Sequence, residues 1–320
     1  MACVLSVNDH LTRGVIAMKI GILGDLHLKA SRPLNRIDDY QETQTGKILQ
    51  AFEKFHEEGC TAILQPGDFF DSYGKDPYSI TNEAIALRMT YRTPMYVVFG
   101  QHDVKFHNTH LPDIPIQVLN KSDLVERVSN EEPTRIDNSK HEEVLLYGSS
   151  WGEPIPKPPP RKKNRWNILL AHKMIIKNKK LWPGQKDYIM SRTMLRKGFD
   201  LIVTGDNHQA FTYKDRLINC GSLMRMKVDQ HDHHPMFCIF DTDEEKLDVY
   251  YYDVQPSELV LRKKETDEVK ESKKSQEDLK QELSSTDFDG ELDFRHNIEQ
   301  AMRTRKVKRR TKQIIEDSIN

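Results

Sequence analysis

The chain has few cysteines, and none of them are closely spaced. The four thiols are Cys3, Cys60, Cys220 and Cys238 in 320 residues. Disulfide frameworks of secreted proteins use repeated close spacings, which are missing here. The pattern predicts reduced thiols and a cytosolic protein.

Long apolar runs and net charge are missing as well. No stretch of about 18 apolar residues occurs, so the sequence predicts no membrane span. Residues 1–17 contain Asp9, His10 and Arg13 where a secretory signal would have its apolar core, so we expect an unstructured extension there instead. The formal net charge is −1. Attraction to a polyanion must therefore come from a local patch of basic side chains.

Short apolar runs, each closed by polar residues or glycine, recur between residues 18 and 255. Their length and their Val, Ile and Leu content predict buried strands. We expect these strands at 19–23, 61–65, 95–99, 143–148, 167–171 and 201–205, with a hairpin of two more at 235–241 and 246–254. Apolar residues at helical spacing predict helices at 42–59, 80–91 and 188–198. Together they predict an α/β protein with a sandwich core over 18–255.

The composition changes at Pro256. Residues 256–320 are highly charged and have too few apolar side chains to form a core alone, so we expect a charged, mostly helical tail or disorder. Leu292, Phe294, Ile298 and Met302 keep helical spacing. The tail could pack on the preceding domain, or it could be a segment that folds on a partner.

Side chains that bind metals follow five of the predicted strands. They are Asp25 and His27, then Asp68, then Gln101 and His102, then His172, and finally Asp206 and His208. Because ligand sites of α/β proteins form at strand ends, these loops could converge on one rim. Oxygen and imidazole ligands suit Mn²⁺, Mg²⁺, Fe or Zn²⁺. Their number exceeds the needs of one tetrahedral ion and suits two.

A simpler interpretation applies to each motif alone. One Asp or His after a strand is more often a helix cap or turn residue, and a lone buried histidine is more often hydrogen-bonded in the core. Five such strand ends in one chain, some with glycine just ahead of the acid, favour a metal centre. We expect Asp71 and Asp103 to be supporting or turn residues.

The five motifs GDLH, GDFFDS, GQHD, AHK and TGDNHQ resemble those of the calcineurin-like metallophosphoesterases, over most of residues 19–241. GDLHL, GDFFDS and GSLMRMKVDQ (221–230) are most similar to the nuclease subunit of SbcCD and its archaeal and eukaryotic relatives. Those proteins work with an SMC-like ATPase in DNA double-strand break repair. The resemblance implies a four-layer β-sandwich core flanked by helices. It also implies a two-metal DNA phosphodiesterase, with Mn²⁺ as the preferred cation and Mg²⁺ as the alternative.

The resemblance also implies a role for each site residue. The first cation would be held by Asp25, His27 and His208, the bridge would be Asp68, and the second cation would be held by His172, Gln101 and Asp206. His102 would act on the phosphate without binding metal. Two positions depart from the family, which usually has Asn in place of Gln101 and His in place of Asp206. Both replacements can still coordinate a cation.

The substrate prediction depends on the same resemblance and on basic residues. Phosphatases of the superfamily usually have Arg after the second motif and Glu after the third-motif histidine, but here Ser72 follows Asp71 and Asp103 follows His102. A proline-rich basic stretch predicts DNA contacts by Lys157, Arg161, Lys162, Lys163 and Arg165.

The basic run 303–312 is predicted to dock the ATPase or to contact DNA, and a homodimer remains open. The predicted location is the cytoplasm, with association with the nucleoid if the protein is bacterial or viral. The alternatives are a phosphodiesterase of small phosphoesters and a DNA- and ATPase-binding scaffold with weak chemistry.

Overall fold

A computed structural model describes residues 18–74, 78–104, 114–137, 143–163, 165–227 and 230–262. The predicted extension at 1–17 and the tail beyond 262, including the basic run 303–312, lie outside the described residues.

The first of two large sheets has the strand order β14-β13-β1-β2-β3-β4. Its strands are β1 (Lys19–Ile22), β2 (Ala62–Gln65), β3 (Met95–Val97), β4 (Glu126–Arg127), β13 (Met236–Asp241) and β14 (Lys246–Tyr251). Strands β1 to β4 are parallel, so their carboxyl ends meet at one edge. Strand β13 runs antiparallel to both β1 and β14, which confirms the predicted hairpin.

The second large sheet has the order β11-β12-β10-β7-β6-β5. Its strands are β5 (Thr134–Asp137), β6 (Glu143–Ser149), β7 (Arg165–His172), β10 (Leu201–Gly205), β11 (Phe211–Tyr213) and β12 (Leu217–Asn219). Its central strands β6, β7 and β10 are parallel. A separate parallel pair is formed by β8 (Ile175–Ile176) and β9 (Ile189–Met190).

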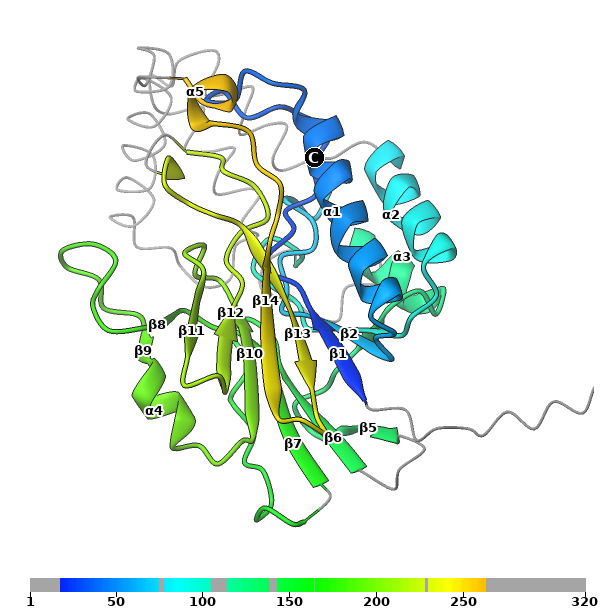
Figure 1. Ribbon diagram of the computed structural model, residues 1–320, viewed down its shortest axis with the longest axis vertical. Coiled ribbons are helices and arrows are strands. Elements are labelled where there is room, and N and C mark those ends of the chain that lie inside the picture. Colours follow the sequence, from blue (N-terminus) through cyan, green and yellow to red (C-terminus); the bar gives the residue numbers. More distant parts are fainter. Residues whose placement is uncertain are drawn as a thin grey trace, which may run out of the picture.

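Helices cover both outer faces of the paired sheets (Figure 1). Helices α1 (Tyr40–Glu57), α2 (Tyr78–Thr90) and α3 (Pro115–Lys121) lie beside the first sheet, and α4 (Ser191–Leu195) lies beside the second. The predicted four-layer sandwich is therefore confirmed.

Alternation along the strands explains the layers. Ile20 and Ile22 of β1 pack with Ile168 of β7 in the cluster between the two sheets, and all three are fully buried. Phe52 and Phe55 of α1 belong to the cluster on the outer face of the first sheet. Burial of each such side chain stabilises the fold by about 1.5–3 kcal/mol.

Two segments differ from the sequence prediction. The helix expected at 188–198 covers only Ser191–Leu195, because β9 precedes it. The β11–β12 hairpin was not predicted. Its turn has Lys214 at φ 54° and Asp215 at φ 49°, the conformation that usually has Asn-Gly. Without glycine, the turn leaves little trace in the sequence.

The packed chain continues past the predicted boundary at 255. Helix α5 (Ser257–Val260) is followed by Leu261, and both Val260 and Leu261 are 3% exposed. The backbone of Ile37 donates to Val260 O at 3.1 Å, which ties this segment to the loop before α1. None of the described helices is long and apolar enough to cross a membrane.

Candidate metal centre

The ligand-type side chains come together at the ends of strands from both sheets. Strands β1 and β2 lead to Asp25 and Asp68 in the first sheet, and β10 leads to Asp206 in the second. The loops are tied directly to one another. The backbone of His27 donates to Asp68 O at 2.9 Å, and the backbone of Asp206 donates to Asp25 Oδ2 at 3.0 Å.

Four of these side chains form a compact group, in which three are buried and His208 is partly exposed. Ligand atoms of Asp25, His27, Asp68 and His208 all lie within 4.8 Å of one another. The facing Nε2 atoms of His27 and His208 are 3.1 Å apart. Asp25 Oδ1 and Asp68 Oδ2 are buried and have no hydrogen-bond partner. Burying such oxygens without compensation is costly, so this group fits a divalent cation.

The remaining predicted ligands lie on the other side of Asp68. His172 Nε2 is 3.4 Å from Asp68 Oδ2 and 2.8 Å from Gln101 Oε1. The Gln101 amide in turn donates to Asp206 Oδ1 at 3.0 Å. Asp68 Oδ2 also lies 3.5 Å from His27 Nε2. One carboxylate oxygen therefore faces both sets of ligands, as a bridging residue must.

His102 stands next to the compact group. Its Nδ1 lies 2.8 Å from Asp71 O, where it can donate, and its ring centroid is 4.8 Å from that of His27. Asp71 is closer to the site than expected of a turn residue. Its Oδ1 is 3.4 Å from His27 Nδ1, and its Oδ2 pairs with Lys29. Ligand atoms of His27, Asp71 and His102 form a second compact group.

Positive charge on neighbouring imidazoles offsets part of the cost of burying Asp68. Burial alone would lower the pKa of His172, but Asp68 and Asp25 raise it to about 10. Burial would raise the pKa of Asp68, but positive charge on His172 holds it below its usual value. Burial and the positive charge of His27 lower the pKa of His208 to about 3. The environment of Asp68 thus favours positive charge, and bound cations would supply such charge.

Two buried polar residues hold the loops in place. Asp103 accepts hydrogen bonds from Phe70 N at 3.0 Å and Gly100 N at 2.9 Å, which joins the second and third loops. Gln44 of α1 donates to His27 O at 3.0 Å and fixes the first loop, where His27 has φ 47°. Sequence reasoning expected a supporting or turn role for Asp103 but missed Gln44. Its one signal was a polar residue on the apolar face of a helix.

The backbone of the segment GSLMRMK (221–227) is hydrogen-bonded to the loops that contain Asp25 and His208. The backbone of Leu223 donates to Asp25 O at 2.9 Å, and that of Ser222 donates to His208 O at 3.2 Å. Two buried basic side chains hold this segment: Lys47 Nζ donates to Leu223 O at 3.1 Å, and Arg36 donates to Arg225 O at 2.9 Å. Its backbone therefore positions residues of the compact group.

Two glycines are required by close approach to the ligands. A Cβ atom on Gly205 would lie 2.2 Å from Asp25 Oδ1, and one on Gly100 would lie 2.0 Å from Asp68 Oδ1. No side chain fits at either distance, so the carboxylate would have to move.

We therefore expect Gly205→Ala to weaken binding of a divalent cation by at least about 10- to 100-fold, the usual cost of losing support for a ligand. Calorimetric titration with Mn²⁺ measures this effect. Gly46→Ala in α1 is the matched control, because nothing lies within 4 Å of the added methyl group. It should leave cation binding intact and stabilise the helix by about 0.5–1 kcal/mol. Unchanged affinity in Gly205→Ala would contradict the assignment of Asp25.

The residues predicted to contact DNA lie far from this centre. Arg165 begins β7 and His172 ends it, a separation of about 23 Å at 3.3 Å per residue. Figure 1 shows the loop before β7 at the lower end of the molecule. Arg161 is engaged by Asp200 at 3.1 Å. Lys157, Lys162 and Lys163 are exposed. DNA contact by this loop stays a prediction.

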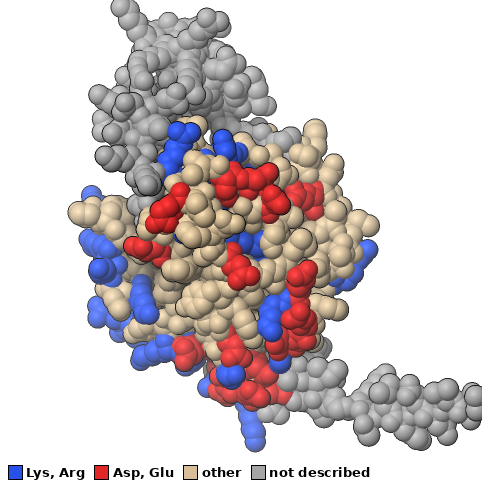
Figure 2. All heavy atoms as spheres, turned by 45° about the horizontal axis from the view of Figure 1, so that its top comes forward, with Lys and Arg blue, Asp and Glu red and all other residues tan. Residues whose placement is uncertain are grey.

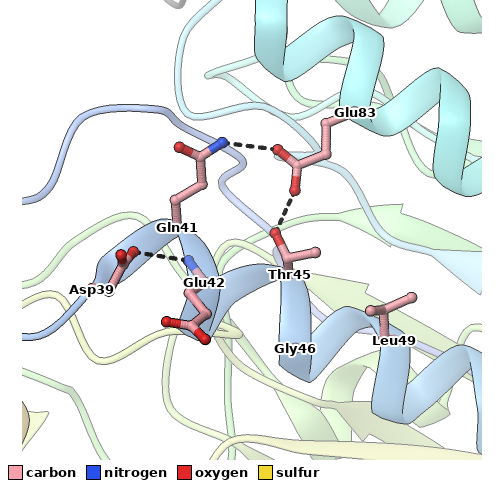
Figure 3. Close-up of a pocket in the computed structure, with 7 residues that line it drawn as sticks. All are labelled: Asp39, Gln41, Glu42, Thr45, Gly46, Leu49 and Glu83. Atoms are coloured by element: carbon pink, nitrogen blue, oxygen red, sulfur yellow. Dashed lines mark hydrogen bonds between the residues drawn. The ribbon is translucent and has the colours of Figure 1, made fainter.

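A hollow of about 490 Å³ lies on the outer side of α1 and α2 (Figure 3). Asp39, Glu42 and Glu83 line it together with Leu49. Glu83 accepts hydrogen bonds from Gln41 and Thr45. An acidic hollow repels phosphate, so we assign it no part in phosphoester binding.

Comparison with protein families identifies the class. The model described as calcineurin-like phosphoesterase matches residues 18–210. The chain therefore belongs to this family of metal-dependent phosphoesterases, and the match covers all five strand ends of the metal centre.

Solved structures with a similar fold include TT1561 of Thermus thermophilus, with 12% identity over 74% of this chain and 99% of that chain and a TM-score of 0.41. A dimetal phosphatase from Danio rerio has 10% identity, coverage of 75% and 97%, and a TM-score of 0.46. Purple acid phosphatase PPD1 from yellow lupin (Lupinus luteus) seeds has 11% identity, coverage of 74% and 52%, and a TM-score of 0.42. Resemblance of this degree does not specify a substrate. No curated protein sequence matches the chain significantly.

Proposed function

We propose that the protein is a DNA phosphodiesterase of the SbcD-like group, a nuclease that acts in DNA repair or recombination together with an SMC-like ATPase. The observation that carries the proposal is the compact Asp25, His27, Asp68 and His208 group, with partnerless carboxylate oxygens, beside His102. Metal-dependent hydrolysis follows from the family and this group. DNA as the substrate follows from the motifs.

In this proposal each side chain has one task. Asp25, His27 and His208 would hold one cation, His172, Gln101 and Asp206 would hold another, and Asp68 would contribute to both. Divalent cations held there would lower the pKa of a bound water and offset charge on the phosphoryl oxygens, and oxygen-rich ligands favour Mn²⁺ or Mg²⁺. His102 keeps Nδ1 engaged with Asp71 O, so Nε2 remains to stabilise charge on the phosphate or to protonate the leaving oxygen.

Features around the site favour a diester of a polyanion over a phosphoprotein. Ser72 and Tyr73 follow Asp71, so an arginine to hold a terminal phosphate is missing at that motif. Asp103 is 1% exposed and engaged by backbone N–H groups, so it does not face the substrate. Lys227 is exposed and close enough to His208 to add to the lowering of its pKa, after burial and His27. It adds positive charge near the metal centre.

Charge elsewhere is mixed. Figure 2 shows Lys and Arg interspersed with Asp and Glu on the described face in view. DNA binding would therefore depend on local contacts, and it should weaken steeply with salt in proportion to the number of phosphates contacted.

The proposed test compares labelled linear DNA with a small chromogenic phosphodiester, each with Mn²⁺ and with a chelator. Metal-dependent digestion of DNA supports the nuclease. Turnover of the small diester alone would favour the alternative enzyme. Binding of DNA without cleavage of either substrate would favour the scaffold.

Partner binding is proposed for the tail beyond residue 262, which contains the basic run 303–312. Because Val260 and Leu261 pack on the core, truncation belongs after Arg262 and not after Val254. The truncated chain should stay folded and keep cation binding but lose association with the ATPase. Co-purification of the truncated chain with the ATPase would place the interface elsewhere. Sedimentation of the full chain alone would decide whether it forms a homodimer.

A further inference from the structure

Gln101 joins the two side chains with which it would hold the second cation. Its Oε1 lies 2.8 Å from His172 Nε2, and its Nε2 donates to Asp206 Oδ1 at 3.0 Å. The amide therefore links the other two members of that ligand set to each other.

The orientation of the amide is fixed by Asp206. A carboxylate only accepts hydrogen bonds, so the NH₂ group must face it and the carbonyl oxygen must face His172. The opposite orientation would place Oε1 against the carboxylate. His172 is held from its other side, where Nδ1 lies 2.7 Å from Pro66 O. The three side chains therefore form a matched chain of donors and acceptors.

The first ligand set contains one direct contact, the 3.1 Å between His27 Nε2 and His208 Nε2, but no amide that joins two other ligands to each other. Asp25 Oδ1 and Asp68 Oδ2 are buried without hydrogen-bond partners, whereas Asp206 Oδ1 and both polar atoms of the Gln101 amide have them. The first set therefore keeps a partnerless oxygen of its own, Asp25 Oδ1, whereas the Gln101 amide of the second set is hydrogen-bonded at both ends.

We propose that Gln101 acts as a latch on the second cation subsite, so that the protein binds one divalent cation tightly and a second only after both hydrogen bonds of the amide break. The inference rests on the ligand sets of the proposed function but not on DNA as the substrate. Breaking two hydrogen bonds of ordinary net strength would make the affinity for the second cation roughly 5- to 150-fold lower than it would be without them.

The length of the side chain matters for the latch. Asparagine has the same amide on a side chain that is one methylene shorter, so Gln101→Asn draws the amide back toward the backbone and should break at least one of the two hydrogen bonds. Gln101→Ala removes the amide altogether. If Gln101 acted chiefly as a ligand, Gln101→Ala would weaken the binding of the second cation. If it is a latch, alanine frees His172 and Asp206, and the second cation binds more tightly.

The test is a titration of chelator-treated full-length protein with Mn²⁺, without DNA, followed by calorimetry and by electron paramagnetic resonance. The parent protein should show one tight binding event and a second that is roughly 5- to 150-fold weaker. The resonance signal should change from that of an isolated Mn²⁺ to that of an interacting pair only during the second event. Two events of equal affinity in the parent would overturn the proposal whatever the variants do.

The variants then test the cause. Gln101→Ala and Gln101→Asn should each narrow the difference between the two affinities by about 5-fold or more. Gln41→Ala is the matched control, because Gln41 hydrogen-bonds Glu83 on the outer side of α1. It should reproduce the parent titration. A wider difference in Gln101→Ala would show that Gln101 strengthens binding of the second cation as a ligand more than its hydrogen bonds oppose it, and would overturn the latch. Failure to digest DNA would count against the proposed function and leave this titration unaffected.

Discussion

Asp68→Asn is expected to abolish phosphodiester cleavage and to weaken the binding of both cations. A single oxygen of Asp68 lies 3.5 Å from His27 Nε2 and 3.4 Å from His172 Nε2, so it serves both ligand sets. Asparagine has the same shape, but it removes one negative charge from a fully buried position. Loss of a residue that only supports a ligand costs about 10–100-fold in metal affinity. Loss of the shared ligand should cost more than about 100-fold for each cation.

Titration with Mn²⁺ and a turnover assay on the same sample measure both effects. The matched control is Asp248→Asn on the exposed side of β14, where the aspartate pairs with Lys246 at 2.9 Å. It should change neither quantity. An Asp68→Asn protein with two bound cations and near-normal turnover would show that Asp68 is not the bridge.

His102→Ala is expected to lower cleavage by about 10²–10⁴-fold, the usual contribution of an acid or base, while the cations stay bound. His102 Nδ1 faces a backbone carbonyl, so the ring has one nitrogen left for the substrate. The backbone N–H of His102 also donates to Asp68 Oδ1 at 2.9 Å, and alanine keeps that bond. The loss should therefore lie in the chemical step and not in assembly of the metal centre.

The competing possibility is specific. His27, Asp71 and His102 are close enough together to hold an ion themselves. Bound metal and turnover must therefore be measured on one preparation of His102→Ala, with His56→Ala at the exposed end of α1 as the control. Loss of a cation together with turnover would make His102 a ligand.

Sequence reasoning worked best where one strand and the loop after it contain the signal. The run LIVTG predicts a buried strand by its composition, and DNH directly after it supplies Asp206 and His208 at the strand end. The same holds for β1 and β2. Because parallel strands end at a common edge, separate motifs could be combined into one site without knowing the sheet order.

Reasoning along the chain gives little information where distance in sequence and distance in space differ. The basic loop ending at Arg165 precedes His172 by only one strand, but that strand is extended and carries the loop to the far end of the sheet. The hydrogen bond between Gln101 and Asp206 joins residues 105 positions apart, so no local sequence pattern could predict it. The loop contacts of Gln44 could not be predicted either, because they depend on how α1 packs.

The two buried thiols between the sheets can be used to detect opening of the sandwich. Cys220 and Cys238 are at most 1% exposed, with sulfur atoms 4.0 Å apart, and both belong to the cluster shared by the two sheets. The neighbouring Cys238 and burial raise the pKa of Cys220 well above its usual value, and thiols react as thiolates. Alkylation of either sulfur therefore has to wait until the sheets separate. The rate of labelling in the folded protein, followed by mass spectrometry, counts how often the sandwich opens.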